Sequence, residues 1–273
     1  MFKINNFFEN DSIHIREEKG AFRIVEYKKD LSVVPLNAME AYFAQEMNVR
    51  KRQLVCDLSC ANITVQSGAM QWTVGDVSAT TGIKGAGDFL SKIVKGKATG
   101  EGAIKPEYVG SGTLVLEPTF KHIILEDLED WNNALAIEDG MYLASEETVE
   151  QKAIMRSNIS SSLFGGEGLF NLSLRGSGIV ALESPCPREE LIEIILDEDT
   201  LKIDGNMVIA WSESLKFSVE RSGKTLIGSA TSGEGLVNVY AGTGRVLLAP
   251  VSLVRPNAHN VPKTSEKPAS KAD

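Results

Sequence analysis

Short apolar runs, bounded by glycine or proline, recur along the whole chain. Three closely similar ones stand shortly before a proline: Leu114–Leu116, Val180–Leu182 and Val246–Leu248. Proline lacks the N–H that a sheet ladder needs, so it suits the end of a strand. Short apolar segments with glycine turns every eight to twelve residues or so are typical of sandwiches, rolls and barrels. The pattern therefore predicts an all-β fold.

An internal repeat organises these segments. The order Gly-Glu-Gly, short strand, Gly-(Ser/Thr)-Gly occurs three times, and the central glutamates Glu101, Glu167 and Glu234 stand 66 and 67 residues apart. A glycine turn and a methionine-bearing strand precede each copy. A steady period of this length indicates three tandem β repeats of about 67 residues. We expect these repeats to take up a pseudo-threefold arrangement.

The repeat divides the chain into an N-terminal arm, three units and a tail. We expect the arm at 1–19, the first unit at 20–120, the second at 121–185 and the third at 186–255. The tail at 256–273 has no apolar periodicity and is expected to be disordered.

Helix signals are scarce. The clearest lies near 37–47, where Asn37 as N-cap and Glu40 three residues later resemble a capping box before an apolar run. A shorter helix is expected at 88–95, where apolar residues are spaced four apart.

Composition bounds the class of protein. A chain of 273 residues with 42% apolar content can bury a core. No apolar stretch approaches the roughly 18 residues that cross a bilayer, and the N-terminus lacks the apolar centre of a signal peptide, so we expect a cytoplasmic location. The net charge of −9 repels phosphate backbones, which predicts no nucleic-acid partner.

The sequence carries no recognised catalytic or metal-binding pattern. Cys56, Cys60 and Cys186 show no metal-ligand spacing with the three histidines, and the first two are expected on one face of a strand as small buried residues. Each Gly-x-Gly phrase precedes a strand instead of a helix, which indicates turn glycines or close strand approach and not a phosphate loop. There is no Gly-x-Ser-x-Gly elbow. We expect no enzyme activity, metal or cofactor.

Two candidate sites remain. Repeated glutamates can converge on a pseudo-threefold axis and hold a cation or a small cationic ligand; alternatively, each accepts hydrogen bonds from its own turn. They are Glu101, Glu167 and Glu234. The second site is a lysine-rich stretch, 84–105, in which Phe89, Lys92 and Lys95 can contact an acidic protein or an anionic membrane surface. A connecting helix packed on the sheet is the alternative there.

Four motifs occur in order along the chain: Tyr42–Leu54, Gly68–Trp72, Thr81–Gly85 and Gly166–Pro185. With these motifs the chain resembles the bacterial branch of the mitochondrial biogenesis, altered-inheritance-of-mitochondria family, over about residues 20–255. The resemblance implies a shortened double-stranded β-helix similar to the trp RNA-binding attenuation protein, with units about a pseudo-threefold axis. Eukaryotic relatives are associated with mitochondrial inner-membrane organisation, which implies scaffolding, and the family pattern supplies no catalytic residues.

These patterns together predict a non-enzymatic cytoplasmic scaffold, or a protein that interacts with other proteins or a membrane surface. Homo-oligomers would form through sheet edges or flat faces. The alternative is a module that binds a small ligand or cation through the three repeated glutamates.

Overall fold

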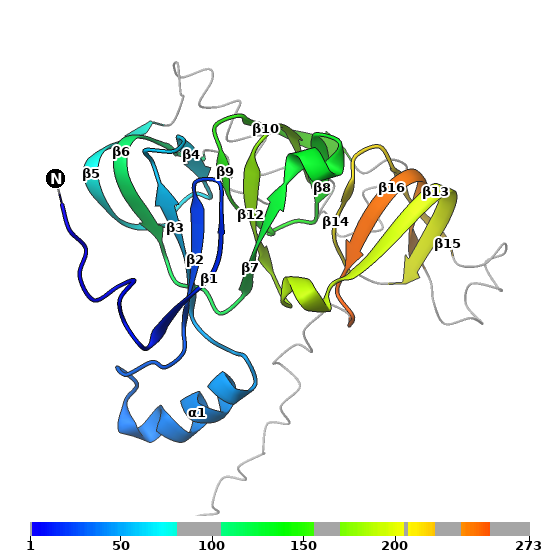
Figure 1. Ribbon diagram of the computed structural model, residues 1–273. Coiled ribbons are helices and arrows are strands. Elements are labelled where there is room, and N and C mark those ends of the chain that lie inside the picture. The colour runs from blue at the N-terminus through cyan, green and yellow to red at the C-terminus, as the bar shows by residue number, and fades with distance from the viewer. Residues whose placement is uncertain (1, 81–104, 156–169, 205–206, 222–235, 252–273) are drawn as a thin grey trace, which may run out of the picture.

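The computed structural model describes residues 2–80, 105–155, 170–204, 207–221 and 236–251. These residues form sixteen strands and one α-helix, which confirms the predicted all-β fold (Figure 1). The helix α1, Ala38–Glu46, lies within the predicted range 37–47. The predicted helix at 88–95 and the tail lie outside the described residues.

The strands fall into three groups along the chain. The N-terminal group holds β1 (Ile13–Lys19), β2 (Phe22–Tyr27), β3 (Arg52–Asp57), β4 (Ile63–Val65), β5 (Met70–Thr80) and β6 (Glu107–Leu116). The central group holds β7 (His122–Asp127), β8 (Ala134–Ile137), β9 (Tyr142–Glu146), β10 (Val149–Met155), β11 (Phe170–Gly176) and β12 (Ile179–Ser184). The C-terminal group holds β13 (Ile192–Asp204), β14 (Val208–Ser212), β15 (Lys216–Arg221) and β16 (Leu236–Leu248). The three groups lie in a row (Figure 1).

Two antiparallel sheets join the groups. The first runs β1-β2-β3-β6-β4-β9-β12-β7, with β5 paired to β6, and the second runs β10-β11-β8-β14-β16-β13, with β15 paired to β16. The central group is therefore shared: β7, β9 and β12 extend the sheet of the N-terminal group, and β8, β10 and β11 extend that of the C-terminal group. The pseudo-threefold arrangement of the repeats stays a prediction.

Each group of strands closes the apolar core of its neighbour. Ile24 and Leu114 of the N-terminal group pack in one core with Ala144 and Ala181 of the central group. In the next core, Leu135 and Leu174 of the central group pack with Ile209 and Leu247 of the C-terminal group. Trp211 and Tyr240 lie in a third core. Burial of such side chains is the main force that holds the groups together.

The glycine phrases take two forms. Gly176-Ser177-Gly178 forms a turn between β11 and β12, as expected, but Gly110 and Gly242 lie in the middle of β6 and β16. A turn is the wrong alternative there, because the strand continues through the glycines; at Gly110 the other alternative, close approach of a neighbouring strand, is present, since the Asp76 carbonyl of β5 lies against it. The expected positive φ is present: 119° at Gly110, 111° at Gly176 and 124° at Gly242. Only glycine adopts such backbone angles readily.

Two local expectations are also wrong. Asn37 makes no side-chain capping hydrogen bond, so the predicted capping pair with Glu40 does not form. Cys56 lies buried in β3, whereas Cys60 lies beyond the end of that strand and is exposed, so the two thiols do not share a strand face.

Candidate functional site

The connection between β2 and β3 leaves the body of the protein. We call residues 28–51 the α1 segment; it contains a short 3-10 turn, Pro35–Asn37, and then α1. Alanine, methionine, glutamate and glutamine favour helix here, and proline suits the first turn. The segment projects below the sheets (Figure 1).

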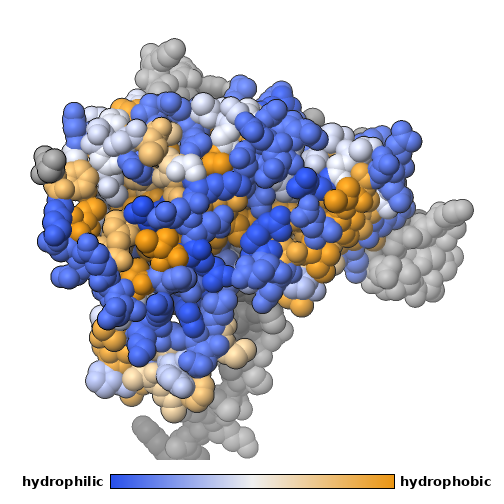
Figure 2. Space-filling model, viewed as in Figure 1, coloured by the Kyte–Doolittle hydropathy of each residue, from blue (hydrophilic) through white to orange (hydrophobic). Residues whose placement is uncertain are grey.

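The apolar side chains of the α1 segment face solvent. No residue of α1 is buried. The exposed fractions are 80% for Leu31, 57% for Val34, 92% for Leu36, 73% for Met39, 59% for Tyr42, 61% for Phe43, 78% for Met47 and 47% for Val49. Figure 2 shows apolar surface on this projection. A helix that is apolar on several sides normally lies inside a protein. This surface is therefore the kind that a partner covers.

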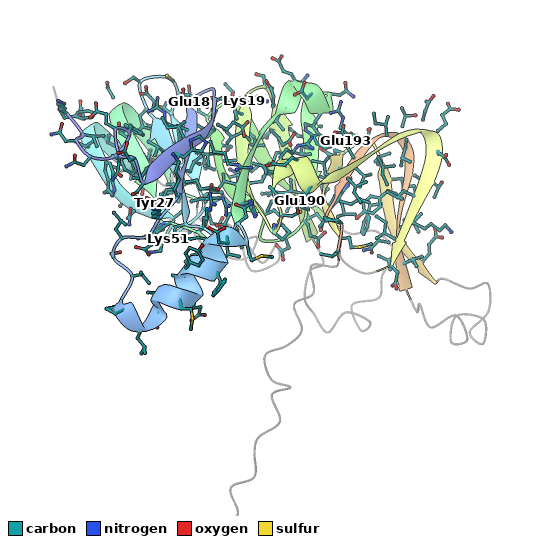
Figure 3. The ribbon with its side chains drawn as sticks, turned by 60° about the horizontal axis from the view of Figure 1, so that its bottom comes forward. Glu18, Lys19, Tyr27, Lys51, Glu190 and Glu193 are labelled. Carbon is teal, nitrogen blue, oxygen red and sulfur yellow. The ribbon has the colours of Figure 1, made fainter. Side chains whose placement is uncertain are left out.

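A hollow of about 470 Å³ lies between α1 and the sheet. Its apolar lining comes from Tyr27, Val33, Ala41, Ala44, Val49 and Phe120. Tyr27 and Lys51 lie where the α1 segment meets the sheet (Figure 3). The exposed helix and the hollow beside it thus form one continuous apolar site.

Two charged groups at the rim of the hollow, Asp30 and Lys51, bond to each other. Lys51 Nζ lies 2.6 Å from Asp30 Oδ2. Hydrogen bonds from Lys51 and Ser32 lower the pKa of Asp30 to about 2. The Tyr27 hydroxyl donates to Gln53 Oε1 at 2.5 Å, and burial raises the pKa of Tyr27. Because these polar groups already bond within the protein, we expect a partner to bind the site mainly through apolar contacts.

A buried ion pair fixes the root of the α1 segment. Arg52 Nε donates to Glu26 Oε2 at 2.8 Å, and their side chains are 1% and 3% exposed. Arg52 also donates to the Asn48 carbonyl at 3.0 Å and to Asn48 Oδ1 at 2.9 Å. Arg50 Nη1 reaches Glu26 Oε1 at 3.2 Å. The segment therefore projects from a fixed base.

One histidine lies beside this ion pair. His122, at the start of β7, is half-buried, and burial together with the positive charges of Arg52 and Arg16 lowers its pKa to about 4. Its imidazole is neutral at neutral pH. It contributes no positive charge to the site.

All six site residues predicted from the sequence lie outside the described residues, so their roles stay predictions: Glu101, Glu167, Glu234, Phe89, Lys92 and Lys95. Within the described ranges, no group of three or more His, Cys, Asp or Glu side chains is placed to hold a metal. No helix in that part of the chain has the length and apolarity needed to span a membrane. Sequence reasoning located α1 but missed its exposure, because a helix without a polar face, such as the one that carries Tyr42 and Phe43, is ordinarily buried.

The fold and the site define an all-β protein in which two antiparallel sheets share the central group of strands and an apolar helix projects from the sheets. The chain belongs to the mitochondrial biogenesis AIM24 family, whose model matches residues 46–251. Most of the α1 segment precedes the matched region.

Two similar proteins come from Streptococcus pyogenes. An uncharacterized protein of serotype M6 is 29% identical over 199 residues, which cover 70% of this chain and 78% of the relative. An X-ray structure of a protein from this species, solved by a structural genomics consortium, matches with a TM-score of 0.56 and 22% identity. The match covers 85% of this chain and 94% of the streptococcal chain in the X-ray structure. This second likeness concerns the fold alone.

Proposed function

We propose that this chain is a non-enzymatic, cytoplasmic scaffold that binds an apolar segment of a partner protein through the α1 segment. The observation that carries the proposal is the exposure of Met39, Tyr42 and Phe43 on a helix whose base is fixed. Aromatic residues and methionine are enriched in protein interfaces, and a fixed base lowers the entropy that binding costs. The hollow beside α1 can receive a side chain of the partner.

A protein partner fits this surface better than a membrane surface. Helices that lie on membranes separate an apolar face from a polar face rich in lysine and arginine. The charged residues of α1 are Glu40 and Glu46, and apolar side chains occur on several sides of the helix. An acidic helix is repelled by anionic lipid. A groove in another protein, by contrast, covers more than one side of a helix.

The non-enzymatic part of the proposal draws on the bonding of the charged groups around the site. Glu26 and Arg52 pair with each other, and Asp30 pairs with Lys51. These groups hold the α1 segment in place. They therefore have structural partners already.

Site-specific cross-linking tests the proposal. A photoreactive phenylalanine analogue replaces Tyr42 in one variant and Val251, which is 70% exposed, in a control. We expect a discrete protein adduct from position 42 in the producing cells and none from position 251. The adduct should disappear when Met39→Ser and Phe43→Ser are added. The same adducts from both positions, or none from position 42, would contradict the proposal.

A matched variant and a vesicle assay complete this test. Ile195→Ser with Val251→Ser removes two equally exposed apolar side chains elsewhere and should leave the adduct intact. Flotation with vesicles of anionic phospholipid examines the membrane alternative. If the unaltered protein floats with the vesicles and the Met39→Ser/Phe43→Ser variant does not, the α1 segment binds a membrane surface instead of a protein.

The hollow also supports a second candidate function, binding of a small apolar molecule. Its volume of about 470 Å³ lies within the roughly 300–1,000 Å³ of ligand sites. Ala44→Trp would fill the hollow and leave the outward side chains of α1 unchanged. If Ala44→Trp abolishes a ligand-dependent rise in melting temperature but keeps the cross-link at position 42, the hollow binds a ligand of its own.

A further inference from the structure

Two junctions inside the chain are built in the same way. At the first, β4 pairs antiparallel with β9, and at the second, β8 pairs antiparallel with β14. The paired residues are Ile63↔Glu146, Thr64↔Ser145 and Val65↔Ala144 at the first, and Leu135↔Ser212, Ala136↔Trp211 and Ile137↔Ala210 at the second. The same short strand of one group thus adds to the same edge of the next group each time.

The hydrogen bonds that flank these pairs agree as well. At the first junction Glu147 N–H donates to Asn62 C=O at 2.9 Å and Gln66 N–H donates to Leu143 C=O at 2.8 Å. The corresponding bonds at the second junction are Glu213 to Ala134 at 3.2 Å and Glu138 to Ile209 at 2.9 Å. The strand pairs and the flanking hydrogen bonds therefore show that the same interface occurs twice in the chain.

Backbone landmarks locate the two unused halves of this interface. A register shift falls between Met70 and Trp72 in β5 and between Val208 and Ala210 in β14. The pairing of β9 shifts at the corresponding place, beside Tyr142. Residues 70–74 are thus the counterpart of β9 and β14. Strand pairing locates the other half. Leu201 of β13 lies opposite Tyr240, just as Ile63 of β4 lies opposite Tyr108. Residues 200–204 are therefore the counterpart of β4 and β8.

These two halves lie at opposite ends of the row of strands, and no other described strand pairs with their outer edges (Figure 1). Within the described ranges, β5 pairs only with β6 and β13 only with β16. Met70 is 42% exposed and Thr73 is exposed, whereas Tyr142 and Val208 are buried. Lys202 is exposed, whereas its counterpart Ala136 is 0% exposed. Exposed strand edges of this kind readily accept another strand.

We propose that a second copy of this chain docks head to tail, with residues 200–204 of one copy adding to residues 70–74 of the next. The internal register predicts the pairs Leu201↔Val74, Lys202↔Thr73 and Ile203↔Trp72. Because the two surfaces differ, the contact is heterologous and makes a ring where the rotation closes and a filament where it does not. The pairing uses the interface that already joins the three groups inside the chain.

The N-terminal arm lies beside the receiving edge, and its Phe2 comes close to Gly75, next to the pairing segment. The Phe7 ring packs against Trp72, with 5.9 Å between ring centroids, on the face of β5. No backbone hydrogen bond joins residues 2–8 to β5 in the described structure. The hydrogen-bonding groups of the edge lie in the plane of the sheet, beside the arm. A second copy can therefore pair with this edge while Phe7 keeps its contact.

Disulfide trapping tests the register. In a Cys60→Ser background, Thr73→Cys and Lys202→Cys place one thiol on each edge, because directly opposite residues have Cβ atoms about 5 Å apart. Under mild oxidation, an equimolar mixture of the two single variants should give a cross-linked dimer, and either variant alone should not. No cross-link in the mixture, or equal cross-linking of one variant alone, would overturn the proposal.

A charge exchange provides the second test, by sedimentation velocity over a range of protein concentrations. Thr73→Lys opposes Lys202 in the docked pair and should weaken association, because like charges directly opposite repel. Adding Lys202→Glu should restore it. Ser78→Lys on the same strand, outside the pairing segment, should leave the mass unchanged. A monomeric unaltered chain at every concentration, or equal mass for Thr73→Lys and the unaltered chain, would refute the docking; far-UV circular dichroism verifies that each variant is folded.

Discussion

Glu26 and Arg52 lie directly opposite each other on β2 and β3 and form an almost fully buried ion pair. The same arginine donates to Asn48 in the α1 segment. One side chain thus joins the sheet to the base of the projecting helix. A buried charge of this kind is costly to leave without its partner, because protein surroundings solvate it poorly.

Glu26→Gln should therefore lower the free energy of unfolding by about 3 kcal/mol, because it leaves Arg52 buried without a carboxylate. Urea denaturation measures this as a lower midpoint. The exposed pair Glu18 and Arg23 supplies the control: Glu18→Gln should cost less than about 1 kcal/mol. Equal costs for the two changes would show that the buried pair does not fix the base of the α1 segment.

The exposed side chains of α1 should contribute little to stability. Phe43→Ser should change the free energy of unfolding by less than about 0.5 kcal/mol, because the ring is already 61% exposed. Leu116→Ala, at a site that is 0% exposed, should cost about 2–5 kcal/mol. The melting temperatures of the two variants, compared with that of the unaltered protein, measure this difference in stability. A large loss for Phe43→Ser would mean that the ring is covered in the free protein, and would weaken the proposed docking role.

The sequence predicted the class of fold and the position of α1, because strand and helix signals are local. Glycine and proline bound the apolar runs, and alanine, methionine and glutamate favour a helix at α1. Other features have no local signal. The strand β4, Ile63–Val65, is only three residues long, and nothing in those residues indicates that they pair with β9.

Exposure is the second feature that local patterns do not contain. An apolar helix is ordinarily a core helix, so the sequence around Tyr42 and Phe43 favours burial. Which neighbour covers a side chain depends on the whole fold. The same limit applies to Gly110 and Gly242, where the residue type indicates an unusual φ but not whether the chain turns or continues as a strand.

Alanine substitutions at Gly110 and Gly242 separate two costs: the backbone strain of a positive φ and the overlap of the added Cβ with neighbouring atoms. Both glycines have positive φ, a sparsely populated region that costs an alanine roughly 1–3 kcal/mol. A Cβ at Gly110 would lie 2.1 Å from the Asp76 carbonyl oxygen, whereas at Gly242 the nearest atom, on Leu215, is 3.8 Å away. Gly110→Ala should therefore destabilise the protein more than Gly242→Ala, by at least about 1 kcal/mol. Urea midpoints measure both variants, and the reverse order would contradict the close approach of β5 and β6.

His122 predicts a dependence of stability on pH. Burial and the charges of Arg52 and Arg16 hold its pKa near 4 in the folded chain, against an ordinary value of 6.5. Between these values the unfolded chain binds a proton that the folded chain does not, so this group makes stability fall as the pH is lowered from about 6.5 to about 4. Below about 4 both states are protonated and its effect stops changing.

A neutral replacement isolates this effect from that of the carboxylates. Glu26 and Glu189 also face His122, and Asp30, with its pKa lowered to about 2, acts only below its ordinary value of 3.8. His122→Gln keeps a polar side chain without a charge, so its urea midpoint should fall less than that of the unaltered protein between about pH 6.5 and about pH 4.5. The two proteins should behave alike between about pH 7.5 and about pH 8.5, where the imidazole is neutral in both states. Parallel curves across the acidic range would show that His122 titrates as freely in the fold as in the unfolded chain, and that the positive charges at the root of the α1 segment do not reach it.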